Sequence, residues 1–251
     1  MAQAISEMGD WFYALAIYNL LLELTGRAEA VALAVILQVL PQSLIGPTAG
    51  VVNDRLSRKQ VMIVADLARV VTVLCMLFAR TPATVWIVYP LLFVETLMAS
   101  FFEPARSAVI PNVVREEETT VANTLSATTW SFDLAVGAMF GGIVAAWLGR
   151  DAVFILNALS FLGSAWLIWR MHFTEPHLDA PPFHVRELIS LAPVMDGVRY
   201  MRRDRHIFAS VFLKAGVGIL GSSFVLLPVM GERLFPCDRS SQTLTAPRCW
   251  P

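Results

Sequence analysis

The chain has 251 residues, of which 56% are hydrophobic and 16% charged, and its mean hydropathy is +0.61. Soluble domains carry about 25% charged residues, so this composition indicates a membrane protein. The net charge of −1 and the lack of a basic stripe interleaved with aromatic residues do not favour nucleic-acid binding. Cys75, Cys237 and Cys249 show no paired spacing, so we expect neither a disulfide framework nor a metal site.

Seven stretches are long and apolar enough to cross a bilayer, which takes about 20 predominantly apolar residues. We place these spans at 8–25, 30–52, 61–79, 84–102, 124–148, 152–169 and 207–230. Residues 171–206 hold Pro176, Pro181 and Pro182, so we interpret this segment as a linker outside the bilayer. The sequence therefore predicts an all-α membrane protein with a six-helix bundle in residues 1–170, followed by the linker and one more span.

Lys and Arg are distributed unequally between the two sides of these spans. One side has three, namely Arg27, Arg80 and Arg150. The other side has eleven, namely Arg55, Arg58, Lys59, Arg106, Arg115, Arg170, Arg186, Arg199, Arg202, Arg203 and Arg205. Cytoplasmic loops carry the excess of basic residues, so we predict that the second side and the N-terminus face the cytoplasm.

The stretch 46–59, which reads GPTAGVVNDRLSRK, separates the second span from the third. Gly46 and Gly50 lie four apart, which leaves one helix face bare for a close neighbour. Asp54 is placed to accept hydrogen bonds from the free amides at the start of the next helix, where its charge is also favoured. The basic residues are expected to hold the loop at the cytoplasmic headgroups; they are Arg55, Arg58 and Lys59.

This loop resembles a motif of the major facilitator superfamily, which usually has Gly where Ser57 stands. The matching residues are Gly50, Asp54, Arg55, Arg58 and Lys59. Further matches follow in order along the chain: Gly9-Asp10-Trp11, Ala65-Asp66-Leu67-Ala68-Arg69, Phe101-Phe102-Glu103-Pro104-Ala105-Arg106, Ala122-Asn123 and Asn157-Ala158-Leu159-Ser160-Phe161. Together they are similar to the drug and siderophore exporter branch, which includes enterobactin and macrolide efflux proteins.

The resemblance implies a secondary active transporter in which two six-helix bundles rock around a site near the midplane of the membrane. It implies proton-coupled export of drug-like or siderophore-like small molecules across the plasma (inner) membrane, with no cofactor. In the family the loop Asp helps to latch the two bundles, so Asp54 is a gating candidate; the alternative is a loop that only sets topology. Span five carries Gly137, Gly141 and Gly142, so we expect close helix packing through this glycine face. Ala138 stands where antiporters of the superfamily often have proline, which weakens the evidence for antiport.

Ionisable residues inside spans are expensive and are functional candidates by default. Spans one and four line the cavity in the family, so the resemblance makes Asp10 and Glu95 candidates for proton coupling. A carboxyl group in a low-dielectric site holds its proton more readily, which suits a proton carrier. Asp10 could instead cap the first helix at the membrane surface. Asp133, in span five, could line the cavity or pair with a neighbour.

A second set of charged residues is expected to be structural. Asp66 and Arg69 lie three apart on one helix face, close enough to pair. Together with Arg106 they are expected to brace the loop motif near the cytoplasmic ends of the spans.

Other classes of protein receive little support. The sequence has no nucleophile elbow, Walker loop or selectivity-filter signature, so we expect neither an enzyme, nor an ATP-driven pump, nor a channel. The alternative to a transporter is a non-transporting fragment of one, because residues 231–251 lose the apolar pattern just after the seventh span. A frameshift or premature stop would explain this tail and the missing second bundle. We then expect the chain alone to export drugs no better than a vector control.

Overall fold

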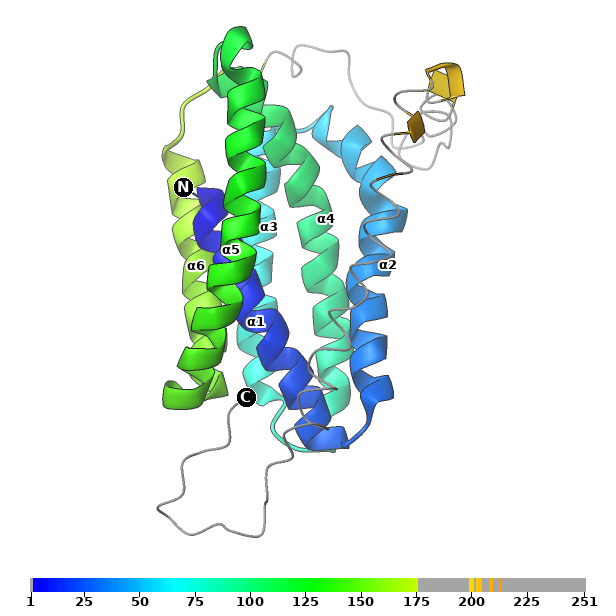
Figure 1. Cartoon of the computed structure of the whole chain (residues 1–251), viewed down its shortest axis with the longest axis vertical. Helices are drawn as coiled ribbons and strands as arrows, with labels where there is room; N and C mark the ends of the chain where they lie inside the picture. Colours follow the sequence, from blue (N-terminus) through cyan, green and yellow to red (C-terminus); the bar gives the residue numbers. More distant parts are fainter. Residues whose placement is uncertain (1, 176–198, 201, 205–207, 210–212, 214–251) are drawn as a thin grey trace. The chain divides into compact units, whose positions relative to one another are not determined.

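The computed structural model describes residues 2–175, 199–200, 202–204, 208–209 and 213. Residues 2–175 belong to one compact unit (Figure 1). Its helices are α1 (Ala2–Thr25), α2 (Ala28–Asn53), α3 (Arg58–Cys75), α4 (Val88–Val113), α5 (Thr119–Leu148) and α6 (Arg150–Arg170). Short 3-10 turns lie at Met76–Phe78, Val85–Ile87 and Glu116–Glu118.

Each span predicted between residues 8 and 169 coincides with one of these helices. The fold is therefore all-α, as the apolar pattern predicts. The seventh span at 207–230, the tail at 231–251 and most of the linker at 171–206 lie outside the described residues, apart from 171–175 and a few isolated positions.

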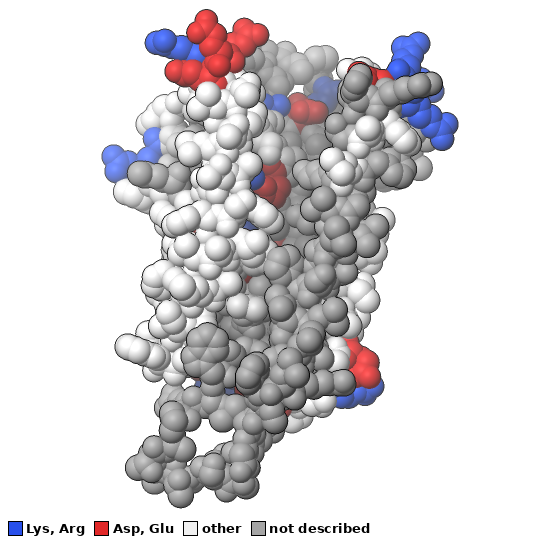
Figure 2. All heavy atoms as spheres, in the orientation of Figure 1, with Lys and Arg blue, Asp and Glu red and all other residues white. Residues whose placement is uncertain are grey.

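Five segments of the described chain are long and apolar enough to cross a membrane, and they cover α2 to α6. The remaining helix, α1, has 24 residues but carries Glu7, Asp10 and Glu23. On the face seen in Figure 2, the charged atoms of the described residues gather mostly towards the two ends, most described atoms between the ends are uncharged, and a few charged atoms are recessed below the surface. This distribution suits a bundle that crosses a bilayer.

The fourth helix extends past the span predicted for it. That span ends at 102, whereas α4 continues to Val113 with Pro104 and Pro111 in its interior. Glu103 and Arg106 therefore lie on the helix rather than in a loop. Their side chains pair with each other three residues apart, so their charges do not end the helix.

Successive helices run in opposite directions, so one end of the bundle collects the starts of α1, α3 and α5 and the ends of α2, α4 and α6 (Figure 1, upper end). We call it the α2–α3 end. At the opposite end, the α1–α2 and α5–α6 connections each turn at a glycine with positive φ, Gly26 at 65° and Gly149 at 84°. That conformation is open to glycine at little cost.

Helix α1 packs along α5 and α6, α2 packs along α4, and α3 packs along α4 and α6. Small residues set the distance between α1 and α5. A Cβ atom at Gly141 would lie 2.8 Å from Phe12 Cα, and one at Gly137 would lie 2.9 Å from Trp11 Cβ. The predicted close packing through this glycine face is confirmed for both positions, whereas Gly142 faces open space.

The sequence predicts that Gly46 and Gly50 leave one face of α2 bare for a close neighbour, and no described helix occupies that face. No described atom lies within 4 Å of a Cβ built at either position. Among the described residues, α2 packs mainly along α4, and nothing covers the face that carries these two glycines.

Candidate functional site

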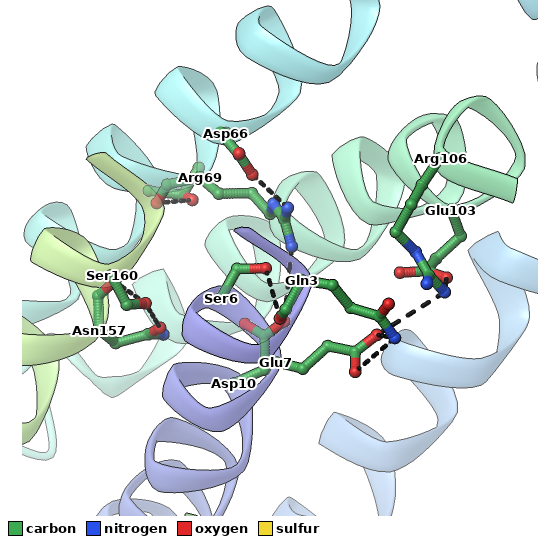
Figure 3. Close-up of polar contacts among 11 residues, drawn as sticks. Gln3, Ser6, Glu7, Asp10, Asp66, Arg69, Glu103, Arg106, Asn157 and Ser160 are labelled. Carbon is green, nitrogen blue, oxygen red and sulfur yellow. Dashed lines mark hydrogen bonds and ion pairs between the residues drawn. The ribbon is translucent and has the colours of Figure 1, made fainter. Parts of the chain in front are cut away.

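Three charged side chains from two helices meet in the interior of the bundle, and we call them the inner triad (Figure 3). Arg69 on α3 donates through Nη2 to Oδ1 of Asp66, one helical turn earlier. Its Nη1 lies 3.5 Å from Oδ2 of Asp10 on α1. The side chains of Asp66 and Arg69 are 0% and 3% exposed, whereas that of Asp10 is 34% exposed. One arginine therefore connects a fully buried carboxylate to an accessible one.

Arg69 also contacts two aromatic rings. Its guanidinium carbon lies 4.7 Å from the centre of the Phe102 ring on α4 and 4.2 Å from that of Phe161 on α6. Such cation–π contacts stabilise a desolvated guanidinium. Glu95, on the buried side of α4, interacts electrostatically with both Asp10 and Arg69. Four helices thus converge on Arg69.

The inner triad and Glu95 contain three carboxyl groups and one guanidinium. Asp10 Oδ1, Asp66 Oδ2 and Arg69 Nε are buried without a hydrogen-bond partner among the described residues. A buried polar atom without a partner costs about 1–3 kcal/mol, so native proteins rarely keep several together without a functional reason. With more carboxyl groups than cations, the cluster can take up either a proton or a positively charged group.

A second charged cluster lies nearer the α2–α3 end, and we call Glu7, Glu103 and Arg106 the end triad. Arg106 Nη2 lies 2.6 Å from Oε2 of Glu103 and 3.7 Å from Oε1 of Glu7. Arg106 Nη1 donates to Ser126 Oγ at 2.8 Å, which ties α4 to α5. Gln3 Nε2 donates to Glu7 at 3.1 Å, and Ser126 Oγ donates to Gln3 Oε1 at 2.9 Å. Two uncharged side chains, Gln3 and Ser126, therefore add hydrogen bonds to the end triad.

The structure places the three predicted bracing residues, Asp66, Arg69 and Arg106, in two different clusters. Asp66 and Arg69 pair as the spacing predicts, but they share the inner triad with Asp10. Arg106, expected beside them, belongs to the end triad. Asp133 is buried on α5, has no hydrogen-bond partner for Oδ2 among the described residues, and interacts electrostatically with Glu7.

Arg58 holds the α2–α3 loop against α4. Its Nη1 donates to the carbonyl oxygen of Ala108 at 2.9 Å, and its Nε donates to that of Asn53 at 3.2 Å. Asn53 Nδ2 donates to the carbonyl oxygen of Phe101 at 3.0 Å, so the end of α2 is tied to α4 as well. Asp54 lies 3.4 Å from Arg58, and its side chain is 70% exposed. Its carboxylate therefore faces outwards from the bundle.

The carboxylate at the start of α3 is Glu175 rather than Asp54, so the prediction for Asp54 is wrong. Glu175 Oε1 accepts from the amide of Arg58 at 2.7 Å and from that of Lys59 at 3.4 Å, and Oε2 accepts from Ser57 Oγ at 2.6 Å. Ser57 also caps α3 by accepting from the amide of Gln60. Asp54 ends α2 instead, which points its side chain away from these amides.

Sequence reasoning gave no role to three acidic residues, Glu7, Glu103 and Glu175, although Glu103 lies in one of the matched motifs. A local signal exists for two of them, since Glu7 precedes Asp10 by three residues and Glu103 precedes Arg106 by three. No local signal points to Glu175, because its partner Ser57 lies 118 residues earlier.

Comparison with known proteins assigns the family. Residues 1–244 match the Major Facilitator Superfamily. The chain is 28% identical over 241 residues to macrolide efflux protein A of Streptococcus pyogenes, covering 93% of this chain and 56% of the relative. It is 25% identical over 203 residues to the uncharacterized MFS-type transporter YfiS of Bacillus subtilis (strain 168), covering 80% and 48%.

A further relative is the putative bacilysin exporter BacE of Bacillus subtilis, which is 27% identical over 194 residues, covering 75% of this chain and 47% of the relative. The chain spans about half the length of the curated relatives it matches. A match over nearly the whole chain, together with an all-α bundle of membrane-crossing helices, leads to one assignment. The chain belongs to the major facilitator superfamily.

Proposed function

We propose that this chain provides a six-helix bundle of a secondary active exporter that moves amphipathic small molecules in exchange for protons. The observation that carries the proposal is the interior cluster of three carboxyl groups around one arginine. Intramembrane ionisable residues mark proton and substrate paths in transporters. Because the polar atoms of this cluster are incompletely paired, a proton or a substrate cation bound there would find ready partners.

Within the cluster, the residues have different roles. Asp66 stays bound to Arg69 and fixes its position, because both side chains are almost fully buried. Asp10 and Glu95 are the exchanging groups: Asp10 contacts Arg69 only at 3.5 Å and is partly exposed, and Glu95 interacts electrostatically with both. A proton on Asp10 would weaken its hold on Arg69, which would couple protonation to the packing of α1 against α3.

The substrate class rests on the relatives. One is named a macrolide efflux protein, another a putative bacilysin exporter and a third a multidrug resistance protein. These names support export of medium-sized organic molecules by this chain.

We also propose that the α2–α3 end faces the cytoplasm. Within residues 2–175, Arg55, Arg58, Lys59, Arg106, Arg115 and Arg170 lie at that end of the bundle, against Arg27, Arg80 and Arg150 at the other. This six-to-three ratio follows the positive-inside rule. The N-terminus would then be cytoplasmic as well.

The loop motif is proposed to gate the transporter at this end against a second bundle; its residues are Gly50, Asp54, Arg55, Arg58 and Lys59. Arg58 fixes the loop on α4, while the Asp54 carboxylate points outwards, where a latch partner could reach it. In the most apolar stretch of each helix, the buried share is 18% for α2 and 17% for α5, against 44% for both α3 and α6. Faces as open as those of α2 and α5 would suit a second bundle.

The test is efflux from cells that produce this chain together with the second six-helix bundle of a macrolide efflux relative. We expect cells with both bundles to retain less macrolide than vector controls. An uncoupler and Glu95→Gln should each abolish this difference. The control Glu23→Gln should not, because Glu23 pairs with Arg150 at the end of the bundle opposite the α2–α3 end. Efflux that survives the uncoupler would contradict proton coupling. With both bundles in the membrane, absence of efflux would contradict export.

A further inference from the structure

A hollow of about 520 Å³ opens on the outer surface at the α2–α3 end. It is lined by Lys59, Trp169, Arg170 and His172. Lys59 belongs to the first turn of α3, and the other three lie at or just beyond the end of α6, which packs along α3. None of these residues belongs to the inner triad or the end triad, so the hollow is a separate feature.

The two cationic side chains of the hollow are held in place. Lys59 Nζ donates to the carbonyl oxygen of Met171 at 2.7 Å, which uses one of its three N–H donors. The guanidinium carbon of Arg170 lies 5.0 Å from the centre of the Trp166 ring. Among the described residues that line the hollow there is no carboxylate. Two fixed positive charges therefore face an open, water-accessible space.

The backbone amides at the start of α3 are not available to bind an anion in this hollow. The carboxylate of Glu175 already accepts from the amides of Arg58 and Lys59. An anion in the hollow would therefore be held by side chains rather than by the helix terminus.

Exposed apolar side chains lead away from the hollow along both helices. On α6 they recur at alternating spacings of four and three residues, at Ile155, Leu159, Leu162, Trp166 and Trp169. On α3 and the 3-10 turn that follows it, they recur in the same way at Val64, Leu67, Val71, Leu74 and Phe78. Such spacing keeps each set on one face of its helix. Tryptophan at the charged end of an apolar track is typical of the level of lipid headgroups.

We propose that this hollow binds the headgroup of an anionic phospholipid, with an acyl chain lying along the exposed stripes of α3 and α6. The phosphate would accept from Lys59 and Arg170, and the two tryptophans would bracket the boundary between headgroup and chain. A zwitterionic lipid brings its own cationic group towards these two side chains, so the site should discriminate against it. The proposal does not depend on transport.

The test uses the full chain, purified in detergent without lipid and titrated with phosphatidylglycerol or phosphatidylcholine, with bound lipids counted by native mass spectrometry. We expect the first phosphatidylglycerol to bind more tightly than the first phosphatidylcholine. Arg170→Gln should weaken it about fivefold, because one basic side chain near an anionic group contributes about 1 kcal/mol. Arg170→Lys, which keeps the charge, should restore most of the affinity.

The matched control is Arg115→Gln, which removes one positive charge at the same end but away from the hollow. It should leave the affinity unchanged. Equal binding of the two lipids, or equal weakening by Arg115→Gln and Arg170→Gln, would overturn the proposal. Displacement of the lipid by inorganic phosphate at similar concentration would also overturn it, since the ligand would then be a soluble anion. Retained helical circular dichroism and a single size-exclusion peak show that each variant is folded.

Discussion

The inner triad and the end triad are built alike but lie in different surroundings. In each, an arginine pairs with a carboxylate three residues earlier on its own helix and with another from α1. The two α1 residues, Glu7 and Asp10, are themselves three apart. Arg69 is nevertheless 3% exposed and lies between two phenylalanine rings, whereas Arg106 is 19% exposed and donates to Ser126.

The two triads have the same arrangement of charges but differ in how completely their polar atoms are hydrogen-bonded. In the inner triad, three buried polar atoms have no hydrogen-bond partner among the described residues, whereas in the end triad only Arg106 Nε lacks one. A satisfied network rigidifies the structure around it. A buried polar atom without a partner is costly, so a bound group that pairs with it would be stabilised. We therefore interpret the end triad as an anchor between α1, α4 and α5, and the inner triad as the site where we propose that a proton or substrate binds.

The largest difference between the two triads is expected in the loss of folding stability when each arginine is replaced. Arg69→Gln leaves Asp66 buried without a counter-charge and should cost about 3–5 kcal/mol of folding free energy. Arg106→Gln should cost only about 1 kcal/mol, because the Glu103 side chain is 38% exposed to water and Glu7 keeps its hydrogen bond from Gln3. The measurement is thermal unfolding of the purified chain in detergent. Restored stability in the double variant Asp66→Asn/Arg69→Gln is the control, and equal losses for the two arginines would contradict the distinction.

The inner triad also depends on where α1 is held. Gly141→Ala would press a methyl group against the Phe12 backbone at 2.8 Å, which cannot move alone, so we expect a loss of about 1–3 kcal/mol. Gly142→Ala, one residue further along, meets open space and should be neutral or slightly stabilising. Thermal unfolding measures both variants. Equal effects would show that close packing of α1 on α5 does not position Asp10.

A smaller effect is expected at the start of α3, where Glu175 accepts from the amides of Arg58 and Lys59. Glu175→Gln weakens the acceptor for two amides and one hydroxyl, a loss of about 1 kcal/mol. We expect the amides of Arg58 and Lys59 to exchange hydrogen for deuterium about fivefold faster, as local opening becomes easier. Asp54→Asn should leave these rates unchanged, since that carboxylate does not contact them. Faster exchange in Asp54→Asn alone would reverse the assignment.

Local patterns in the sequence predict much of this architecture. Hydropathy places α2 to α6, whose apolar runs are long enough to cross a bilayer, and the span predicted at 8–25 falls within α1. The Asp66–Arg69 pair follows from helical spacing alone. The glycine face of α5 was likewise expected to allow close packing, and it contacts α1 at Gly137 and Gly141.

Contacts between distant segments could not be predicted in this way. The Asp10–Arg69 contact joins residues 59 apart, and the Ser57–Glu175 contact joins residues 118 apart. Spacing within one helix carries no information about which neighbouring helix lies opposite. The same limit explains the error at Asp54, since the amides of α3 were available to any carboxylate brought near them, and Glu175 occupies them.

The most direct test of the central claim is proton release when a macrolide binds to the purified chain, followed with a pH indicator in weakly buffered solution. If the inner triad and Glu95 exchange protons for substrate, the wild-type chain releases protons, Glu95→Gln and Asp10→Asn release fewer, and Glu103→Gln in the end triad matches the wild type. No release from the wild type, or the same reduction in Glu103→Gln as in Glu95→Gln, would contradict the account.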